Sequence, residues 1–287
     1  MLAAQSIRSS AKVLLSPLPS REQWIGCLLG QCIGDAVGAP VEGLPPKDCQ
    51  KHVDKVLRQG LLDDAFLGQS RFGQYTDDSQ LARELLLSLV EHGRLQSVDY
   101  AGRIARLFRS GEVVGAGKAT AEVALRLSEG VAPDEAGIPA PSAGNGSAMR
   151  AAPIGLWYAD EPDALIAAAR EQSRITHQDI RCAAGAVAVA GAVALALRGG
   201  ALQPEPFLAE LAEWVAKHRS RLPIVAFMAG RFMDEMKGMR FGHAGTIVEG
   251  WAWFRRVDRR THYGSGASEV LVEIRPRVRT STQLARG

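Results

Sequence analysis

Residues 76–92 have the sequence TDDSQLARELLLSLVEH, and this segment gives the strongest indication of the fold. Its apolar residues recur with helical spacing, at Leu81, Leu85, Leu86, Leu89 and Val90. The pattern predicts a helix that runs to His92 and begins directly after the acidic pair, so Asp77 and Asp78 lie at or in its first turn.

Similar patterns predict helices along most of the chain. The expected helices are 21–38, 48–60, 79–92, 99–110, 119–129, 151–158, 163–173, 179–197, 206–217 and 223–236. An irregular connection is expected at 63–75, a Pro/Ser/Gly-rich loop at 131–146, and a single strand is suggested at 269–278. Since strand-type alternation is otherwise absent and no repeat or linker divides the chain, we expect one all-α domain, an orthogonal helical bundle.

The composition is typical of a globular protein. The chain has 287 residues, and its 46% hydrophobic content is ample for a buried core. The longest apolar stretch, 183–197, is shorter than the roughly 18 residues that a membrane span needs, so we expect a buried helix and no membrane role. The four cysteines show no zinc or disulfide spacing, which favours a reducing cytoplasm.

Charge divides the chain unevenly. Residues 1–244 carry 26 basic and 27 acidic side chains, whereas 245–287 carry 8 arginines and 4 acids. We interpret 1–20 as a disordered extension, 21–244 as the folded domain and 245–287 as a degenerate Arg-rich segment. A basic stripe interleaved with aromatics is absent, so we expect no nucleic-acid partner, and we expect a monomer.

The tripeptide Thr76-Asp77-Asp78 has two interpretations. A hydroxyl and two carboxylates are hard oxygen ligands of the kind that Mg²⁺ and Mn²⁺ prefer. Thr followed by two acids is also an ordinary helix start, in which the side-chain oxygen caps free amides and the carboxylates complement the helix dipole.

The segment GDAVGAPVE, residues 34–42, provides a second pair of carboxylates. We expect Asp35 and Glu42 to lie near one locus, with Asp35 contacting substrate and Glu42 free to face a cleft. The alternative is that Asp35 bonds to local backbone and Glu42 is a solvated surface residue. Glycines four residues apart, at 26, 30, 34 and 38, predict a smooth helix face that a helix or ligand approaches closely.

The segment SAGNGSAMR, residues 142–150, is a run of small residues before an apolar helix. Backbone amides of Gly144, Asn145, Gly146 and Ser147 can converge on an anion such as a diphosphate, although a plain turn has the same composition. The segment SRITHQD, residues 173–179, places His177 before the next helix. His177 is a candidate ribose contact, or a corner residue beside a cap formed by Thr176 or Asp179.

Together, GDAVGAPVE, YTDDS, GNGSAMRAAPIGL and SRITH resemble the ADP-ribosylglycohydrolase (DraG-like) family, in the same order over residues 24–197. The resemblance implies an all-α fold with a central cleft and a two-metal Mg²⁺ or Mn²⁺ centre. It also implies hydrolysis of the N- or O-glycosidic bond between ADP-ribose and a protein side chain. The expected partner is therefore an ADP-ribosylated protein or an ADP-ribose-containing small molecule.

The resemblance also implies a role for each motif. Thr76, Asp77 and Asp78 would be metal ligands, with Asp77 and Asp78 also catalytic. Glu42 would be a catalytic or substrate-orienting carboxylate, Gly144–Ser147 the diphosphate loop and His177 a ribose-side contact.

One family motif does not occur in these 287 residues. The family completes its metal site with Gly-Gly-Asp-Thr-Asp-Thr, whereas the acids of 245–287 are Glu249, Asp258, Glu269 and Glu273. Three ligands are too few for two divalent ions, each of which takes about six oxygens. We therefore expect reduced metal occupancy and activity, or a catalytically silent ADP-ribose-binding or structural protein. We interpret 245–287 as a frameshifted or degenerate end; the less favoured alternative is that Asp258 or Glu273 replaces the missing ligands.

Overall fold

Packed helices make up the scaffold, which the computed structural model describes over residues 19–58, 73–199 and 203–217. The elements are α1 (Arg21–Gly38), η1 (Ala39–Val41), α2 (Pro46–His52), η2 (Val53–Arg58), α4 (Asp77–His92), α5 (Ser97–Arg109), α6 (Lys118–Ser128), α7 (Pro133–Ala136), α8 (Ala152–Trp157), α9 (Pro162–Arg174), α10 (Ile180–Leu197) and α11 (Pro204–Lys217). Over these described ranges no strand forms, and the isolated β-pairing is one parallel bridge between Ile138 and His177. The all-α expectation is confirmed.

The helix boundaries follow local chemistry. α1 has the predicted bounds, and Ser20 begins it with a capping box in which Ser20 and Gln23 bond each other's backbone amides. α4 begins two residues before the predicted start because the Thr76 side chain accepts from the Asp78 amide and caps the helix. The helix predicted at 48–60 starts earlier, at Pro46, and continues as the π-turn η2. The loop predicted at 131–146 contains the short helix α7, and the elements predicted at 223–236 and 269–278 lie outside the described residues.

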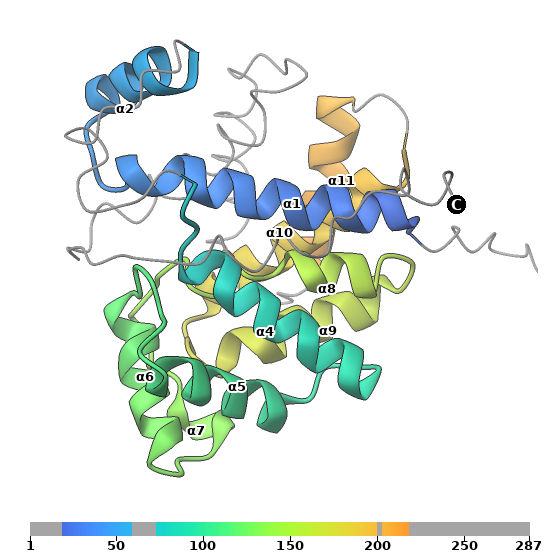
Figure 1. Ribbon diagram of the computed structural model, residues 1–287. Coiled ribbons are helices and arrows are strands. Elements are labelled where there is room, and N and C mark those ends of the chain that lie inside the picture. Colours follow the sequence, from blue (N-terminus) through green and yellow to red (C-terminus); the bar gives the residue numbers. More distant parts are fainter. Residues whose placement is uncertain (1–18, 59–72, 200–202, 218–287) are drawn as a thin grey trace, which may run out of the picture.

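Helix α10 is the core of the packing, as predicted for the apolar stretch 183–197. It contacts α8, α9 and α11, and Figure 1 shows it behind α8 and α9. Gly155 of α8 lies so close to α10 that a Cβ built there would be 2.3 Å from the Ala190 carbonyl oxygen. By length and composition, α10 and the stretch Arg21–Val41 could each cross a membrane, but the packing of α10 is that of a core helix.

Helix α1 runs across α4 and α8 (Figure 1). The Gln23 Nε2 atom donates to the Leu197 carbonyl at 2.9 Å, which ties α1 to the end of α10. Trp24 meets Trp157 edge to face, with ring centroids 6.2 Å apart. The predicted glycine face is only partly in contact, since Gly34 is buried but no atom of the described residues lies within 4 Å of a Cβ built at Gly26 or Gly38.

Two helix glycines provide a test of this packing. Gly155→Ala forces a Cβ against the Ala190 carbonyl, so it should lower the free energy of unfolding by about 1–3 kcal/mol. Gly26→Ala is the matched control, because its Cβ meets no neighbour and alanine favours a helix by up to about 1 kcal/mol. Chemical denaturation measures both, and equal stability of the two variants would contradict the close α8–α10 contact.

Candidate functional site

The carboxylate of Asp35, on α1, binds the first turn of α4. Its Oδ1 atom accepts from Thr76 Oγ1 at 2.7 Å. Its Oδ2 atom accepts from the Thr76 amide at 2.9 Å, and from the amide and hydroxyl of Ser79 at 3.1 and 2.7 Å. With these four donors, Asp35 anchors the start of α4. The alternative in which Asp35 bonds to its local backbone is therefore wrong. Its predicted contact with substrate stays a prediction.

A second side chain of α1 joins α4 to the glycine-rich segment. Gln31 lies one turn before Asp35, so both face the same side of the helix. Its Nε2 atom donates to the Asp78 carbonyl at 3.2 Å and to the Met149 carbonyl at 3.1 Å. Segments that lie 71 residues apart in the chain, at 78 and 149, are thereby held against one helix.

The predicted metal ligands lie at the junction of α1, the start of α4 and the glycine-rich segment. Thr76, Asp77 and Asp78 are all buried, and the carboxylates lie in the first turn of α4, where the positive end of the helix dipole favours negative charge. Both interpretations of the tripeptide are therefore compatible, because Thr76 is the cap. Thr76 Oγ1 donates to Asp35 and accepts weakly, at 3.4 Å, from the Asp78 amide, which leaves one lone pair.

A left-handed glycine covers the same turn. The Asp77 amide donates to the Val114 carbonyl at 2.7 Å. Gly115 has φ +71°, and a Cβ built there would lie 3.4 Å from the Thr76 Cβ and 3.8 Å from Asp77 Oδ1. A residue with a side chain at position 115 would be strained by the positive φ, although its Cβ would only be in van der Waals contact with Thr76 and Asp77.

The glycine-rich segment forms a turn with unused amides. Ala148 and Met149 donate their backbone N–H groups to the Asn145 carbonyl. In the part of the chain that the structure describes, the N–H groups of Gly144, Asn145, Gly146 and Ser147 donate to no protein group. The Ser147 hydroxyl donates to the Cys182 carbonyl at 3.0 Å, so it fixes the turn to α10. Four free consecutive amides agree with the predicted anion-binding role.

His177 packs directly against this turn. The imidazole is buried, and Cβ atoms built at Gly144 and Gly146 would each lie 3.3 Å from its Nε2 atom. Burial lowers the pKa of His177 from its ordinary value of 6.5 to about 4, and the charge of Arg150 acts in the same direction. The imidazole is therefore neutral near pH 7. The cap of α10 is Asp179, whose side chain accepts from the Arg181 amide.

Arg150, which follows the glycine-rich turn and contacts Thr176 next to His177, is fully buried. Its guanidinium lies over the Tyr100 ring, 5.4 Å from the centroid, and it donates to the Gln172 carbonyl and side-chain oxygens and to Thr176 Oγ1. Burial lowers the pKa of Arg150, an effect that Tyr100 and Asp77 oppose. The positive charge of Arg150 thus interacts favourably with the Asp77 carboxylate.

Glu42 is the C-terminal cap of η1, seven residues after Asp35, and it is exposed, unlike Asp35 and the residues of 76–78. Its catalytic role rests on the family resemblance and stays a prediction.

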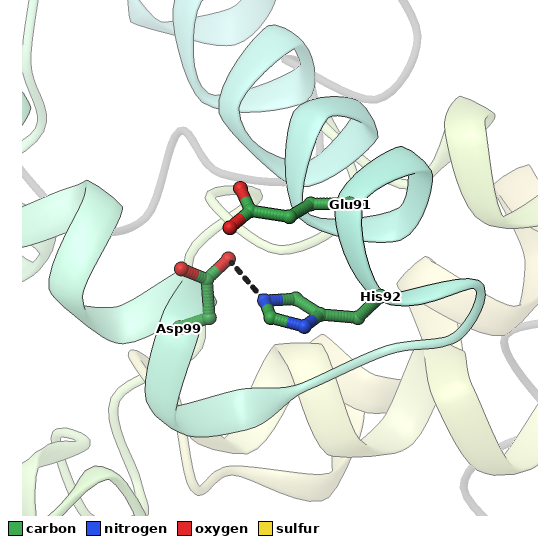
Figure 2. Close-up of side chains that lie close together, drawn as sticks. All are labelled: Glu91, His92 and Asp99. Carbon is green, nitrogen blue, oxygen red and sulfur yellow. Dashed lines mark ion pairs between the residues drawn. The ribbon is translucent and has the colours of Figure 1, made fainter.

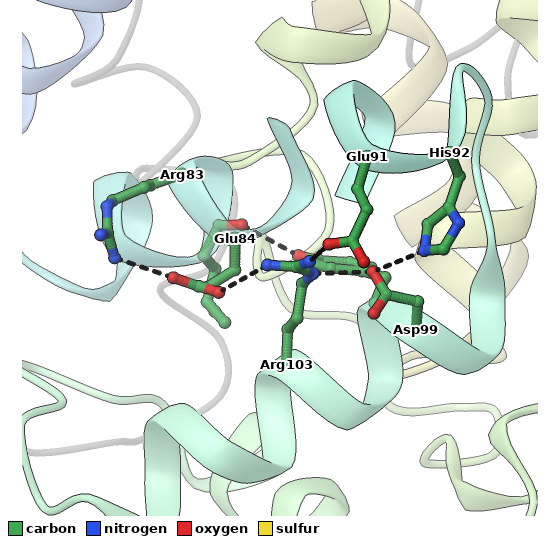
Figure 3. Close-up of polar contacts among 8 residues, drawn as sticks. Arg83, Glu84, Glu91, His92, Asp99 and Arg103 are labelled. Atoms are coloured by element: carbon green, nitrogen blue, oxygen red, sulfur yellow. Dashed lines mark hydrogen bonds and ion pairs between the residues drawn. The ribbon is translucent and has the colours of Figure 1, made fainter. Parts of the chain in front are cut away.

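Another group of possible metal ligands lies at the opposite end of α4. Glu91, His92 and Asp99 have ligand atoms within 4.8 Å of one another (Figure 2). Asp77 and Glu91 are fourteen residues apart on one helix, or about 21 Å at 1.5 Å per residue. Arg103 already binds both acids, with its Nε atom 2.7 Å from Asp99 Oδ2 and its Nη2 atom on Glu91 Oε2 (Figure 3). A cation would have to displace this guanidinium, so the group is better explained as an ion-pair link between α4 and α5.

Several residues of the junction were not identified from the sequence. They are Gln31, Ser79, Gly115, Arg150 and Gln172. Gln31 carries a signal that could have identified it, since it precedes Asp35 by one helical turn. Arg150 also stands inside the quoted motif, but nothing in its spacing reveals that it is buried.

The Asp35 anchor can be tested by Asp35→Asn. The amide places an N–H group among hydrogen-bond donors, so the free energy of unfolding should fall by about 1.5–3 kcal/mol. Asp163→Asn is the control, because Asp163 also lies in the first turn of a helix but is exposed; its effect should stay within about 0.5 kcal/mol. Denaturant titration compares the two, and a loss for Asp35→Asn no larger than that of the control would show that the anchor is unimportant.

Comparisons with known proteins show similarity over most of the chain. The sequence profile of the ADP-ribosylglycohydrolase family matches residues 17–273. ADP-ribosylhydrolase ARH3 of Bos taurus is 34% identical over 203 residues, which cover 67% of this chain and 54% of the relative. ADP-ribosylarginine hydrolase Tri1 of Pseudomonas putida (strain GB-1) is 30% identical over 227 residues, which cover 72% of this chain and 58% of the relative.

A solved structure is also similar. It is described as an ADP-ribosylglycohydrolase-related protein complex, and it superimposes with a TM-score of 0.50 at 31% identity, covering 67% of this chain and 61% of the other. The chain spans a little more than half the length of the curated relatives it matches. Because the family profile covers most of the chain and the helical fold agrees with it, this protein belongs to the ADP-ribosylglycohydrolase family.

Proposed function

We propose that this protein is a divalent-cation-dependent hydrolase that releases ADP-ribose from modified protein side chains. The observation that carries the proposal is the convergence of three motifs on α1, where Asp35 binds the start of α4 and Gln31 binds both Asp78 and the glycine-rich segment. The family membership supports the same reaction class. The relatives ARH3 and Tri1 are named as ADP-ribosylhydrolases, and we extend that activity to this chain as part of the proposal.

The side-chain oxygens of Thr76, Asp77 and Asp78 are ligands of the type that a hard cation prefers. Asp77 and Asp78 are adjacent buried carboxylates, and burial of two like charges is costly unless positive charge compensates them. The helix dipole and Arg150 supply part of this compensation, and a divalent ion held by Thr76, Asp77 and Asp78 would supply the rest. Such an ion would polarise the ribose oxygens and activate a water molecule.

The remaining residues would bind and orient ADP-ribose. The free amides of Gly144–Ser147 would bind the diphosphate, as small side chains let the backbone approach an anion. Neutral His177 carries one ring N–H, which can donate to a ribose oxygen when it lies on Nε2. Glu42, at the surface, would manage the proton while the anomeric carbon gains positive charge.

A second candidate is a protein that binds ADP-ribose without hydrolysing it. It is favoured by the ligand count, since Gly-Gly-Asp-Thr-Asp-Thr does not occur in the 287 residues and three side chains do not fill two octahedral sites. In that case the glycine turn would bind ADP-ribose and no metal-dependent release would follow.

Release of ADP-ribose from arginine- and serine-modified peptides separates these candidates. The purified chain should release ADP-ribose with Mn²⁺ or Mg²⁺, and EDTA should abolish release. Asp78→Asn should reduce the rate by more than about 100-fold, because loss of an outer-shell partner alone costs roughly 10–100-fold in such sites.

Glu91→Gln provides the matched control, since it removes an acid from the other end of α4. It should leave release unchanged. If Asp78→Asn were as active as the parent chain, the proposed metal site would be wrong. If the parent chain bound ADP-ribose in calorimetry but released none with either metal, the second candidate would be correct.

A further inference from the structure

Over the described residues, the imidazole of His177 makes one hydrogen bond, through its Nδ1 atom. Its Nδ1 atom is 2.8 Å from Thr176 Oγ1. Its Nε2 atom faces Gly144 and Gly146, and over residues 19–58, 73–199 and 203–217 it bonds no protein group. His177 as a whole is buried, and within these ranges its Nε2 atom faces the turn without a protein partner.

The neutral ring carries one hydrogen, on Nδ1 or on Nε2. The hydrogen bonds of the neighbouring atom decide between the two forms. Thr176 is fully buried, and its Oγ1 atom accepts from Arg150 Nη2 at 2.7 Å. Arg150 is always a donor and cannot accept, so it cannot take the hydroxyl hydrogen of Thr176.

Among the residues that the structure describes, the hydroxyl hydrogen has one acceptor within hydrogen-bond distance, the Nδ1 atom of His177. If Nδ1 carried the ring hydrogen instead, Thr176 Oγ1 would receive two donors, and its own hydrogen would be buried without an acceptor, which is costly. The geometry thus favours Thr176 as the donor and Nδ1 as the acceptor. The ring hydrogen then lies on Nε2.

We propose that Arg150 and Thr176 are positioning residues that fix His177 in its Nε2–H tautomer and thereby direct one N–H donor at the glycine turn, where a ligand oxygen can accept it. The identity of that ligand as ADP-ribose rests on the proposed function, whereas the tautomer does not.

The pathway of positioning is continuous. Gln172 accepts from Arg150 Nε at 2.8 Å and donates to the Ser147 carbonyl at 2.9 Å, so the group that orients Arg150 also holds the turn. The Ile138 amide donates to the Thr176 carbonyl at 3.0 Å, and the Gln178 amide donates to the Ile138 carbonyl at 2.9 Å. The backbone on both sides of His177 is thereby fixed.

Nitrogen NMR of the full chain with ¹⁵N-labelled histidine tests the proposal directly. The chain has 6 histidines, and the signal of His177 is assigned by its loss in His177→Gln. We expect Nδ1 to have the shift of an unprotonated ring nitrogen and Nε2 that of a protonated one, in a ratio above about 10:1. The reverse assignment, or an even mixture, would overturn the proposal.

Two variants at Thr176 separate positioning from simple packing. Thr176→Val keeps the shape but removes the hydroxyl, so the Nε2–H preference should be lost. Thr176→Ser keeps the hydroxyl, so the preference should remain. An unchanged tautomer in folded Thr176→Val would also refute the proposal, and if that variant fails to fold, the parent and Thr176→Ser spectra decide.

The ligand is tested separately by calorimetry with ADP-ribose. We expect Thr176→Val to bind about tenfold more weakly than the parent and Thr176→Ser to bind as the parent does, a difference of one decade in affinity. Equal affinity of Thr176→Val and parent would exclude a role for the donor in binding. Absence of binding and release by the parent chain would contradict the proposed function, while the NMR assignment would still decide the tautomer.

Discussion

The buried carboxylate of Asp35 is the interaction on which the rest of the junction depends. It satisfies amide groups that a helix start leaves unpaired, and it does so from another helix instead of from the same turn. A negative charge placed against the positive end of α4 also reduces the cost of burying that charge. Consequently α1 and α4 cannot shift relative to each other without leaving a buried charge unpaired, and the position of Asp77 and Asp78 is fixed by the same bonds.

Around this anchor, long polar side chains perform the work that apolar contacts perform elsewhere in the core. Gln31 and Gln172 each bond backbone groups of the glycine-rich segment, and Arg150 binds the end of α9. Such bonds are directional, so they specify how the backbone of residues 144–149 is presented. The apolar core of α8, α9 and α10 supplies the stability, and the buried polar residues supply the orientation.

Helical periodicity accounts for most of what the sequence predicted correctly. The bounds of α1 and the capping role of Thr76 follow from short-range chemistry, as do the first-turn positions of Asp77 and Asp78. The partner of Asp35 could not be predicted in this way, because Thr76 is 41 residues away and periodicity contains no information about which helices meet. The short helix α7 was missed because the four residues Pro-Asp-Glu-Ala do not distinguish a helical turn from a loop.

The two ends of α4 are held by different kinds of interaction. Its first turn is joined to α1 by buried hydrogen bonds of Asp35, whereas its last turn is joined to α5 through ion pairs of Arg103, in which Asp99 is partly buried and Glu91 is exposed. Dissolved salt screens exposed charges over a Debye length of about 8 Å at physiological ionic strength and leaves buried bonds largely unaffected. Changes in ionic strength should therefore weaken the attachment of the last turn of α4 to α5 more than the attachment of its first turn to α1.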